Sequence, residues 1–385
     1  MRNIVLPPGG NWIHYLLHAS SVEALREPLA AYYEIPHGEN GQIPRMAVIG
    51  AAVEGRRLLQ LCQQQGIEVV GLYDDHPRLQ GQVIQGYPIQ PLQQLTSIAR
   101  QTPIVIASHR VLAPMQTLHA RGFTCVMPFA VLQIVQGAVF PPHAFYTDWL
   151  ESVFSHRDIL ASLPDLLADA QSVRVLNALI GFRLTLDPEV LAPIIEWDLY
   201  GPQHVLSYSD NEVYVDGGAF DGDTIARFID RMHGKFDKII GFEPDTQTFR
   251  QLQQRFMQDA RVTAINKGLY SHTDVLYFDN VGTRASSLTS EKTAGIEVPV
   301  TSIDEVLARE RVTYIKMNIE GAEIPALRGA TTAIMQHKPK LGISVYHRPT
   351  DLWEIPRLVK SLRDDYQLYL RQHDGGVIES VLYAI

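Results

Sequence analysis

Short apolar runs alternate with amphipathic stretches in two separate parts of the chain. In the first part the runs lie at 46–50, 69–73 and 104–107, and helical periodicity separates them. In the second part, which begins near Ser207, the same alternation resumes and continues to the C-terminus. Strands that alternate with helices are typical of parallel sheets with right-handed crossovers. The sequence therefore predicts an α/β protein with two Rossmann-like domains.

The region between these two parts has a different pattern of apolar and polar residues. Residues 131–205 show helical periodicity punctuated by prolines, and no strand-like alternation. Near the C-terminus, the turn signal Asp374-Gly375-Gly376 separates two strand-like runs and predicts an antiparallel hairpin at the edge of the second sheet. We expect an irregular or helical segment at 1–42, a small Rossmann-like domain at 43–130, a helical connector at 131–205 and the second domain at 206–385.

Composition narrows the class of protein. The chain has 385 residues, a net charge of -9 and two cysteines. Without a Lys/Arg run, a nucleic-acid partner is not expected. Two cysteines are too few for a disulfide framework or a Cys-based zinc site. We expect neither a signal peptide, because the N-terminal apolar stretch is too short and too polar, nor a membrane span, because no apolar run approaches ~20 residues. We expect a cytoplasmic protein, and the oligomeric state stays open.

The stretch from Val213 to Thr224 is the strongest candidate for a binding site. A β-branched run ends in Asp216 and is followed by glycines, which predicts a buried strand, a tight turn and a helix. Glu243 ends the next strand-like run, where doubly wound folds hold a ribose. An acid before the glycines is expected to repel a phosphate and to suit a cationic ligand. S-adenosylmethionine, with its ribose and sulfonium, fits these features.

The C-terminal ~180 residues, with a predicted parallel sheet, resemble the FkbM-type S-adenosylmethionine-dependent methyltransferases, which have a class I methyltransferase fold. The matching blocks occur in the family's order at 215–224, 241–244, 265–271, 285–288, 300–304, 314–323, 327–330, 343–347 and 351–355. The most specific of these is Tyr314-Ile-Lys-Met-Asn-Ile-Glu-Gly-Ala-Glu323. The resemblance implies methyl transfer to a hydroxyl oxygen of a sugar or secondary metabolite. The acceptor would be a small molecule or a glycan.

Two positions depart from the family pattern. Phe220 stands where the family usually has a small residue or Asn, and Asn318 stands where it has Asp. The Asn keeps hydrogen-bonding capacity but carries no charge. A catalytically weakened binding protein of methyltransferase descent therefore stays an alternative, as does an NAD-dependent oxidoreductase or epimerase.

The first domain has a looser resemblance. The segments 48–56, 70–75, 79–81 and 86–89 are similar to the small Rossmann-like domain of PglD-like bacterial sugar acetyltransferases. This resemblance implies a nucleotide-linked sugar as a ligand, with the helix start at Gly50–Gly55 near a phosphate and Asp74 or Asp75 near a ribose or base. The alternative is a structural or docking role.

We expect the cofactor site to contain Asp216, Gly217, Gly218, Ala219, Phe220, Gly222, Asp223, Thr224, Glu243, Pro244, Asn266, Ser286, Ser287 and Asn318. Several of these have structural alternatives. Asp223 and Thr224 suit a helix N-terminus, Asn266 suits a turn, and the two serines suit any loop.

An alcohol acceptor must lose a proton, so a general base is useful. His347 is the first candidate because it follows an apolar strand, and ligands bind at the carboxyl ends of parallel strands. Glu320 and Glu323 are the alternates. No metal site is expected, since the histidines lack the spacing of a metal cage and nothing supports Mg²⁺ held by Asn318, Glu320 and Glu323.

Overall fold

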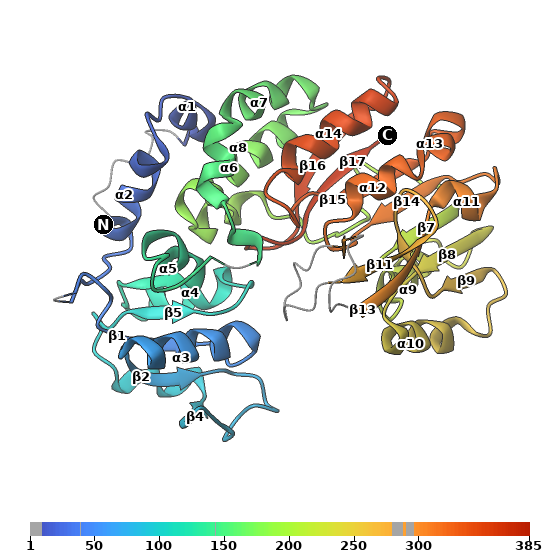
Figure 1. Ribbon diagram of the computed structural model, residues 1–385. Coiled ribbons are helices and arrows are strands. Elements are labelled where there is room, and N and C mark those ends of the chain that lie inside the picture. The colour runs from blue at the N-terminus through green and yellow to red at the C-terminus, as the bar shows by residue number, and fades with distance from the viewer. Residues whose placement is uncertain (1–9, 39, 143, 279–287, 290–295) are drawn as a thin grey trace. The chain divides into compact units, whose positions relative to one another are not determined.

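The computed structural model describes residues 10–38, 40–142, 144–278, 288–289 and 296–385 (Figure 1). The chain divides into two compact units. Unit 1 comprises Met1–Ala161, Arg174–Ile195 and Asp374–Ile378, and unit 2 comprises Ser162–Val173, Glu196–His373 and Glu379–Ile385. The predicted connector at 131–205 thus contributes residues to both units.

Unit 1 contains a six-stranded sheet in the order β3-β4-β2-β1-β5-β6. Its strands are β1 (Arg45–Ile49), β2 (Glu68–Tyr73), β3 (Val83–Ile84), β4 (Tyr87–Gln90), β5 (Ile104–Ile106) and β6 (Val126–Pro128). The first helices are α1 (Trp12–Leu17), α2 (Val22–Tyr32), α3 (Val53–Gln65), α4 (Leu112–Ala120) and α5 (Phe129–Val135). They are followed by α6 (Trp149–Ser155), α7 (Arg157–Ser162) and α8 (Ala170–Thr185), of which α7 and α8 extend into unit 2. β1 pairs in parallel with β2 and β5, as the alternation predicts.

Unit 2 contains a seven-stranded sheet in the order β16-β17-β15-β14-β7-β8-β9 (Figure 1). Its strands are β7 (Val213–Gly217), β8 (Lys238–Phe242), β9 (Val262–Ile265), β14 (Tyr314–Met317), β15 (Lys340–Ser344), β16 (Leu368–Gln372) and β17 (Ser380–Ala384). Its helices are α9 (Asp223–Arg231), α10 (Thr246–Phe256), α11 (Ile303–Leu307), α12 (Glu323–Arg328), α13 (Thr331–His337) and α14 (Asp351–Leu362).

The strand order defines where a ligand can bind in unit 2. β7 pairs in parallel with β8 on one side and with β14 on the other, so the order in which strands are added to the sheet reverses at β7. Such a switch point opens a crevice at the carboxyl ends of the strands. β17 runs antiparallel to both β15 and β16, which confirms the predicted terminal hairpin.

A second sheet in unit 2 was not predicted from the sequence. It has the order β10-β13-β11-β12 and consists of β10 (Gly268–Leu269), β11 (Asp274–Phe278), β12 (Leu288–Thr289) and β13 (Ile296–Thr301). Most of β13 is exposed or half-buried, so this strand lacks the apolar run by which a buried parallel strand is identified.

The core of unit 2 includes stacked aromatic rings on the central strands. Tyr214 on β7 and Tyr314 on β14 are register partners, and their rings stack with centroids 5.0 Å apart. Phe228 of α9 packs against both rings. Among the described residues, every helix is too short or too polar to cross a membrane.

Candidate functional site

Four loops meet at the carboxyl edge of the seven-stranded sheet, because β7, β8, β14 and β15 run parallel. The loop after β7 carries Gly218 and Phe220, and β8 is followed at once by Glu243. Asn318 follows β14, and His347 lies three residues beyond β15. The structure therefore brings most of the predicted site residues of unit 2 to one edge.

Asp216 lies within β7 rather than at the surface of this edge. Its side chain is fully buried, and its Oδ1 lies 2.8 Å from Lys316 Nζ. Oδ2 accepts hydrogen bonds from the hydroxyls of Tyr214 and Thr224. The charge of this acid is therefore balanced inside the protein by a buried lysine, and its contact with a ligand stays a prediction.

The glycines of the first motif are required by packing within the protein. Gly218 has φ +71°, and a Cβ there would lie 2.0 Å from the carbonyl oxygen of Asn318. A Cβ on Gly217 would lie 2.7 Å from Leu269, and one on Gly222 would lie 2.4 Å from the Phe256 ring. Neighbouring backbone at Gly218 and neighbouring side chains at Gly217 and Gly222 thus leave no space for a Cβ at these three positions.

Glu243 has the geometry that a ribose-binding acid needs. Its Oε2 accepts from the Phe220 N–H at 3.0 Å, and its Oε1 accepts from the Asp245 N–H at 2.9 Å. Burial raises its pKa, although the two amides oppose that effect. Each carboxylate oxygen has a second lone pair. The side chain is thus fixed in orientation and can still accept hydrogen bonds from a ligand.

Phe220 lies beside Glu243 and is 60% exposed, which is unusual for a large aromatic residue. Its backbone is left-handed, with φ +49°. The preceding Ala219 is buried, and its N–H donates to the Phe242 carbonyl at 2.9 Å. An exposed ring in a strained conformation next to Glu243 offers a flat apolar surface to a ligand.

The other predicted cofactor residues have contacts within the protein. The Asn266 amide donates to the carbonyls of Glu243 and Pro244, at 2.9 and 3.0 Å, and so holds the end of β8. Asp223 pairs with Arg227 at the surface, 2.7 Å away. Asn318 Oδ1 accepts from the Tyr346 hydroxyl at 3.1 Å. Ser286 and Ser287 lie outside the described residues.

His347, Glu323 and Asp351 form a buried cluster behind the edge. His347 Nδ1 lies 2.8 Å from Glu323 Oε1. Burial lowers the pKa of His347, but the Glu323 carboxylate outweighs it and raises the pKa to about 9. Burial opposes ionisation of Glu323 as well, and His347 lowers its pKa. Burial and the nearby Glu323 raise the pKa of Asp351 to about 7.

Asp351 was not predicted as a site residue. It is the first residue of α14, so the acid was indistinguishable in the sequence from an ordinary first-turn carboxylate that favours the helix dipole. Its spacing of four residues from His347 was the one available signal.

Glu320 differs from its buried neighbours. Its side chain is 45% exposed, and its Oε2 lies 3.9 Å from His347 Nε2. Its backbone is left-handed, with φ +54°. Of the three predicted catalytic residues, Glu320 is the one with substantial access to solvent.

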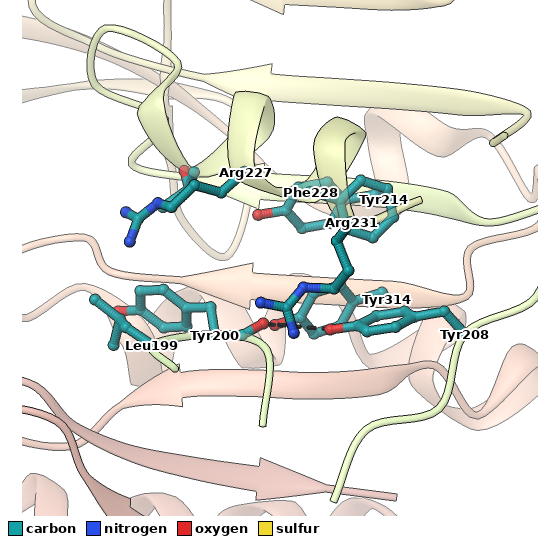
Figure 2. A pocket seen from close by; sticks show the side chains of 9 residues that line it. Leu199, Tyr200, Tyr208, Tyr214, Arg227, Phe228, Arg231 and Tyr314 are labelled. Carbon is teal, nitrogen blue, oxygen red and sulfur yellow. Dashed lines mark hydrogen bonds between the residues drawn. The ribbon is translucent and has the colours of Figure 1, made fainter. Parts of the chain in front are cut away.

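A small hollow of about 20 Å³ lies between α9 and the sheet. Figure 2 shows its lining, in which the Arg231 guanidinium lies among the rings of Tyr200, Tyr208 and Tyr314. The hydroxyls of Tyr208 and Tyr314 both donate to the Tyr200 carbonyl. Of the predicted cofactor residues Thr224 lines this hollow, whereas Glu243 does not, and neither does the predicted base His347.

Unit 1 has a corresponding turn after β1. The Ala51 N–H donates to Asp74 Oδ2 at 2.9 Å, and a Cβ on Gly55 would lie 1.8 Å from the Gly50 carbonyl oxygen. Asp74 thus occupies a backbone N–H that could otherwise donate a hydrogen bond to a phosphate. A nucleotide-linked sugar at this domain stays a prediction.

Comparisons with known proteins agree on the second domain. Residues 216–374 match the family model described as "Methyltransferase FkbM domain". The crystal structure of methyltransferase FkbM from Methylobacillus flagellatus is 27% identical, covers 96% of this chain and all of its own, and gives a TM-score of 0.73. A search of the curated proteins found no match.

Other solved structures are more distant. An rRNA methylase from Streptococcus thermophilus is 16% identical, over 47% of this chain and 88% of its own, with a TM-score of 0.31. Fibrillarin from Aeropyrum pernix, in complex with S-adenosyl-L-methionine, is 11% identical over 46% of this chain and 67% of its own, with a TM-score of 0.30. Similarity this low carries no conclusion about function.

Proposed function

We propose that the domain at residues 216–374, which matches the FkbM methyltransferase family model, transfers a methyl group from S-adenosylmethionine to a hydroxyl oxygen of a sugar or secondary metabolite. Methyl transfer itself follows from the family. The identity of the cofactor and the choice of an oxygen acceptor have to be argued from the geometry of the site.

The geometry of Glu243 is the observation that carries the proposal. Glu243 is 8% exposed and directly follows β8, beside the switch point between β7 and β14. Two backbone amides fix it, and the remaining lone pairs suit the two hydroxyls of a ribose. The exposed ring of Phe220 is suitable for packing against the apolar part of the same nucleoside.

S-adenosylmethionine, when bound, supplies a methyl carbon that a positive sulfur already activates. The protein then has to hold the acceptor oxygen at attacking distance and to receive its proton. Glu320 is suited to that second task, because its carboxylate is partly open to solvent at the edge. His347 and Glu323 are buried and in contact with each other. We therefore propose that they position Glu320 and do not receive the proton themselves.

Titration calorimetry with S-adenosylmethionine tests the cofactor assignment. Glu243→Ala removes hydrogen bonds to a charged group and should weaken binding by at least about tenfold. Glu310→Ala is the matched control, since Glu310 pairs with Lys238 at the opposite end of β8, at 2.6 Å. This control should bind the cofactor as the wild type does.

Two outcomes would contradict the proposal. One is the absence of S-adenosylmethionine binding by the folded wild-type chain. The other is equal affinity in the wild type and Glu243→Ala. Binding of NAD in place of S-adenosylmethionine would favour the oxidoreductase alternative.

A further inference from the structure

Three potential metal ligands from separate elements converge behind the carboxyl edge. Glu323 begins α12, His347 follows β15, and Asp351 begins α14. One donor atom from each side chain lies within 4.8 Å of the other two, and all three residues are buried. Donors about 2.1 Å from one ion lie some 3–4 Å apart, so the three side chains would have to draw together by about 1 Å to bind it.

Backbone amides hold both carboxylates in place. Glu323 Oε1 accepts from the Ile319 N–H at 2.8 Å, and Asp351 Oδ2 accepts from the Arg348 N–H at 2.7 Å. Contacts of this kind orient metal ligands in known sites, because they restrict the carboxylate while the other oxygen can bind the ion. The cluster is therefore preorganised by the loops that follow β14 and β15.

One carboxylate oxygen of the cluster lacks a hydrogen-bond partner within the described part of the chain. Glu323 Oε2 is buried and has no hydrogen-bond partner among the described residues, and the Glu323 side chain is 0% exposed. Burying a carboxylate oxygen without a partner is costly, and such atoms in native proteins are commonly satisfied by a water or an ion. This orphan oxygen is the observation that distinguishes the cluster from a fully satisfied ion pair.

The geometry points to a binding site for one divalent first-row transition-metal cation, held by Glu323, His347 and Asp351. Two carboxylates and one imidazole suit Mn²⁺ or Zn²⁺, and three protein ligands leave a coordination position open. The double positive charge balances two buried carboxylates. Binding of the ion does not depend on the identity of the methyl acceptor.

The proposed metal site also lies next to a residue with a proposed catalytic role. His347 Nε2 lies 3.9 Å from Glu320 Oε2, so the cluster adjoins the residue assigned to receive the proton. A cation there would lower the pKa of an acceptor hydroxyl bound to it. This role in activation rests on the proposed function, whereas the presence of the ion does not.

Binding of Mn²⁺ to the full-length chain tests the site, after treatment with EDTA and exchange into metal-free buffer. The electron paramagnetic resonance signal of free Mn²⁺ should fall until one ion per chain is bound. Asp351→Asn and Glu323→Gln keep the shape of each side chain and its backbone acceptor, and each should weaken Mn²⁺ binding by at least about tenfold. Zn²⁺ should displace the bound Mn²⁺.

Glu354→Gln is the matched control. Glu354 lies in the same first turn of α14 as Asp351 but is exposed, so this variant loses the same charge without losing a ligand. It should bind Mn²⁺ as the wild type does. Circular dichroism checks that all variants are folded.

The site is refuted if the wild type binds neither ion at millimolar concentration, or if Asp351→Asn and Glu323→Gln bind Mn²⁺ as the wild type does. In the first case the cluster is an ion pair between Glu323 and His347 only. Calorimetry with S-adenosylmethionine on the same metal-free samples separates this failure from failure of the proposed function, since the proposed cofactor site at Glu243 contains none of the three ligands.

Discussion

A single buried lysine sets the charge of the glycine-rich turn. Besides its contact with Asp216, Lys316 Nζ donates to the carbonyls of Gly217 and Gly218, at 3.1 and 2.8 Å. The lysine is thus enclosed by one carboxylate and two backbone oxygens, with its side chain 2% exposed. Its ammonium neutralises the acid and fixes the course of the turn.

Removing that lysine should be severely destabilising. Lys316→Met leaves the Asp216 charge buried and unpaired, for which we expect a loss of about 3–5 kcal/mol in the free energy of unfolding, measured by urea denaturation. Arg227→Met breaks the surface pair with Asp223, in which both side chains are about half exposed, and should change stability by less than about 1 kcal/mol. Similar losses of unfolding free energy in the two variants would show that the buried Asp216–Lys316 pair matters no more for stability than the surface pair.

Two non-glycine residues at the edge adopt left-handed backbone conformations, Phe220 and Glu320. Each such conformation costs on the order of 1–3 kcal/mol and persists only where the surrounding structure enforces it. The two residues are also the ones we assign to contact the cofactor and to receive the proton. Other left-handed residues lie elsewhere in the chain, so the conformation supports these two assignments only together with their position at the edge.

At the scale of elements, the turns after β7 and β14 are in van der Waals contact. The contact passes through Gly218, which has space only for a hydrogen in front of the Asn318 carbonyl. The Asn318 N–H in turn donates to the Gly217 carbonyl at 3.1 Å. Glycine at this position therefore determines how closely the two halves of the crevice approach each other.

Two glycine variants distinguish the loss of stability caused by steric overlap from the loss caused by a left-handed backbone. Gly218 and Gly234 have nearly equal φ angles, +71° and +74°, but nothing lies within 4 Å of a Cβ on Gly234. Gly234→Ala should cost roughly 1–2 kcal/mol for the left-handed conformation alone. Gly218→Ala should cost about 1–3 kcal/mol more, because the added methyl group forces the two turns apart.

The same pair of variants reports on the crevice. Thermal and urea unfolding measure stability, and calorimetry measures affinity for S-adenosylmethionine. Gly218→Ala should weaken cofactor binding, whereas Gly234→Ala should not. Equal effects of both substitutions on stability would mean that the turns can separate at no cost.

At the scale of the molecule, unit 2 is assembled from segments far apart in the sequence. The segment Ser162–Val173 joins β16 through a bridge between Leu167 and Leu368. Arg371 on β16 is fully buried and lies 2.6 Å from Asp169. Although burial opposes it, the contact with Arg371 lowers the pKa of Asp169 to about 2. Part of the predicted connector is therefore integral to the second sheet.

His373 links Glu196, another residue of the predicted connector, to the seven-stranded sheet. Its Nδ1 lies 2.5 Å from the Glu196 carbonyl oxygen, and its Nε2 lies 2.9 Å from the Tyr383 hydroxyl. Because a carbonyl only accepts, Nδ1 carries the proton and Nε2 accepts from the tyrosine. Burial lowers the pKa of His373 from 6.5 to about 4.

This histidine should make the stability of unit 2 fall as the pH falls from 6.5 to about 4. Over that range the unfolded chain binds a proton that the folded chain does not, and above it the two states are equally protonated. Between pH 7 and pH 5 the wild type should lose about 2 kcal/mol more than His373→Gln, measured by urea unfolding at each pH. An equal loss in both proteins would show that His373 titrates normally in the folded state.

Most of the fold could be predicted because its signals are local. Apolar runs such as 238–242 and the turn at Asp374–Gly376 encode buried strands and a hairpin in adjacent residues. The sheet of β10–β13 was missed because its exposed strands carry no such run. Glu243 was placed at the edge correctly because its position depends only on where β8 ends.

The partners of the polar residues could not be predicted in this way. Whether Asp216 is charged toward a ligand depends on Lys316, 100 positions away, and whether Asp351 is a surface acid or a buried ligand depends on where α14 packs against α12. Strand ends follow from short-range periodicity, and so the chain alone determined which edge carries the site. Charge, burial and coordination arise from atoms brought together across long separations, and these were decided by the packing of the folded molecule.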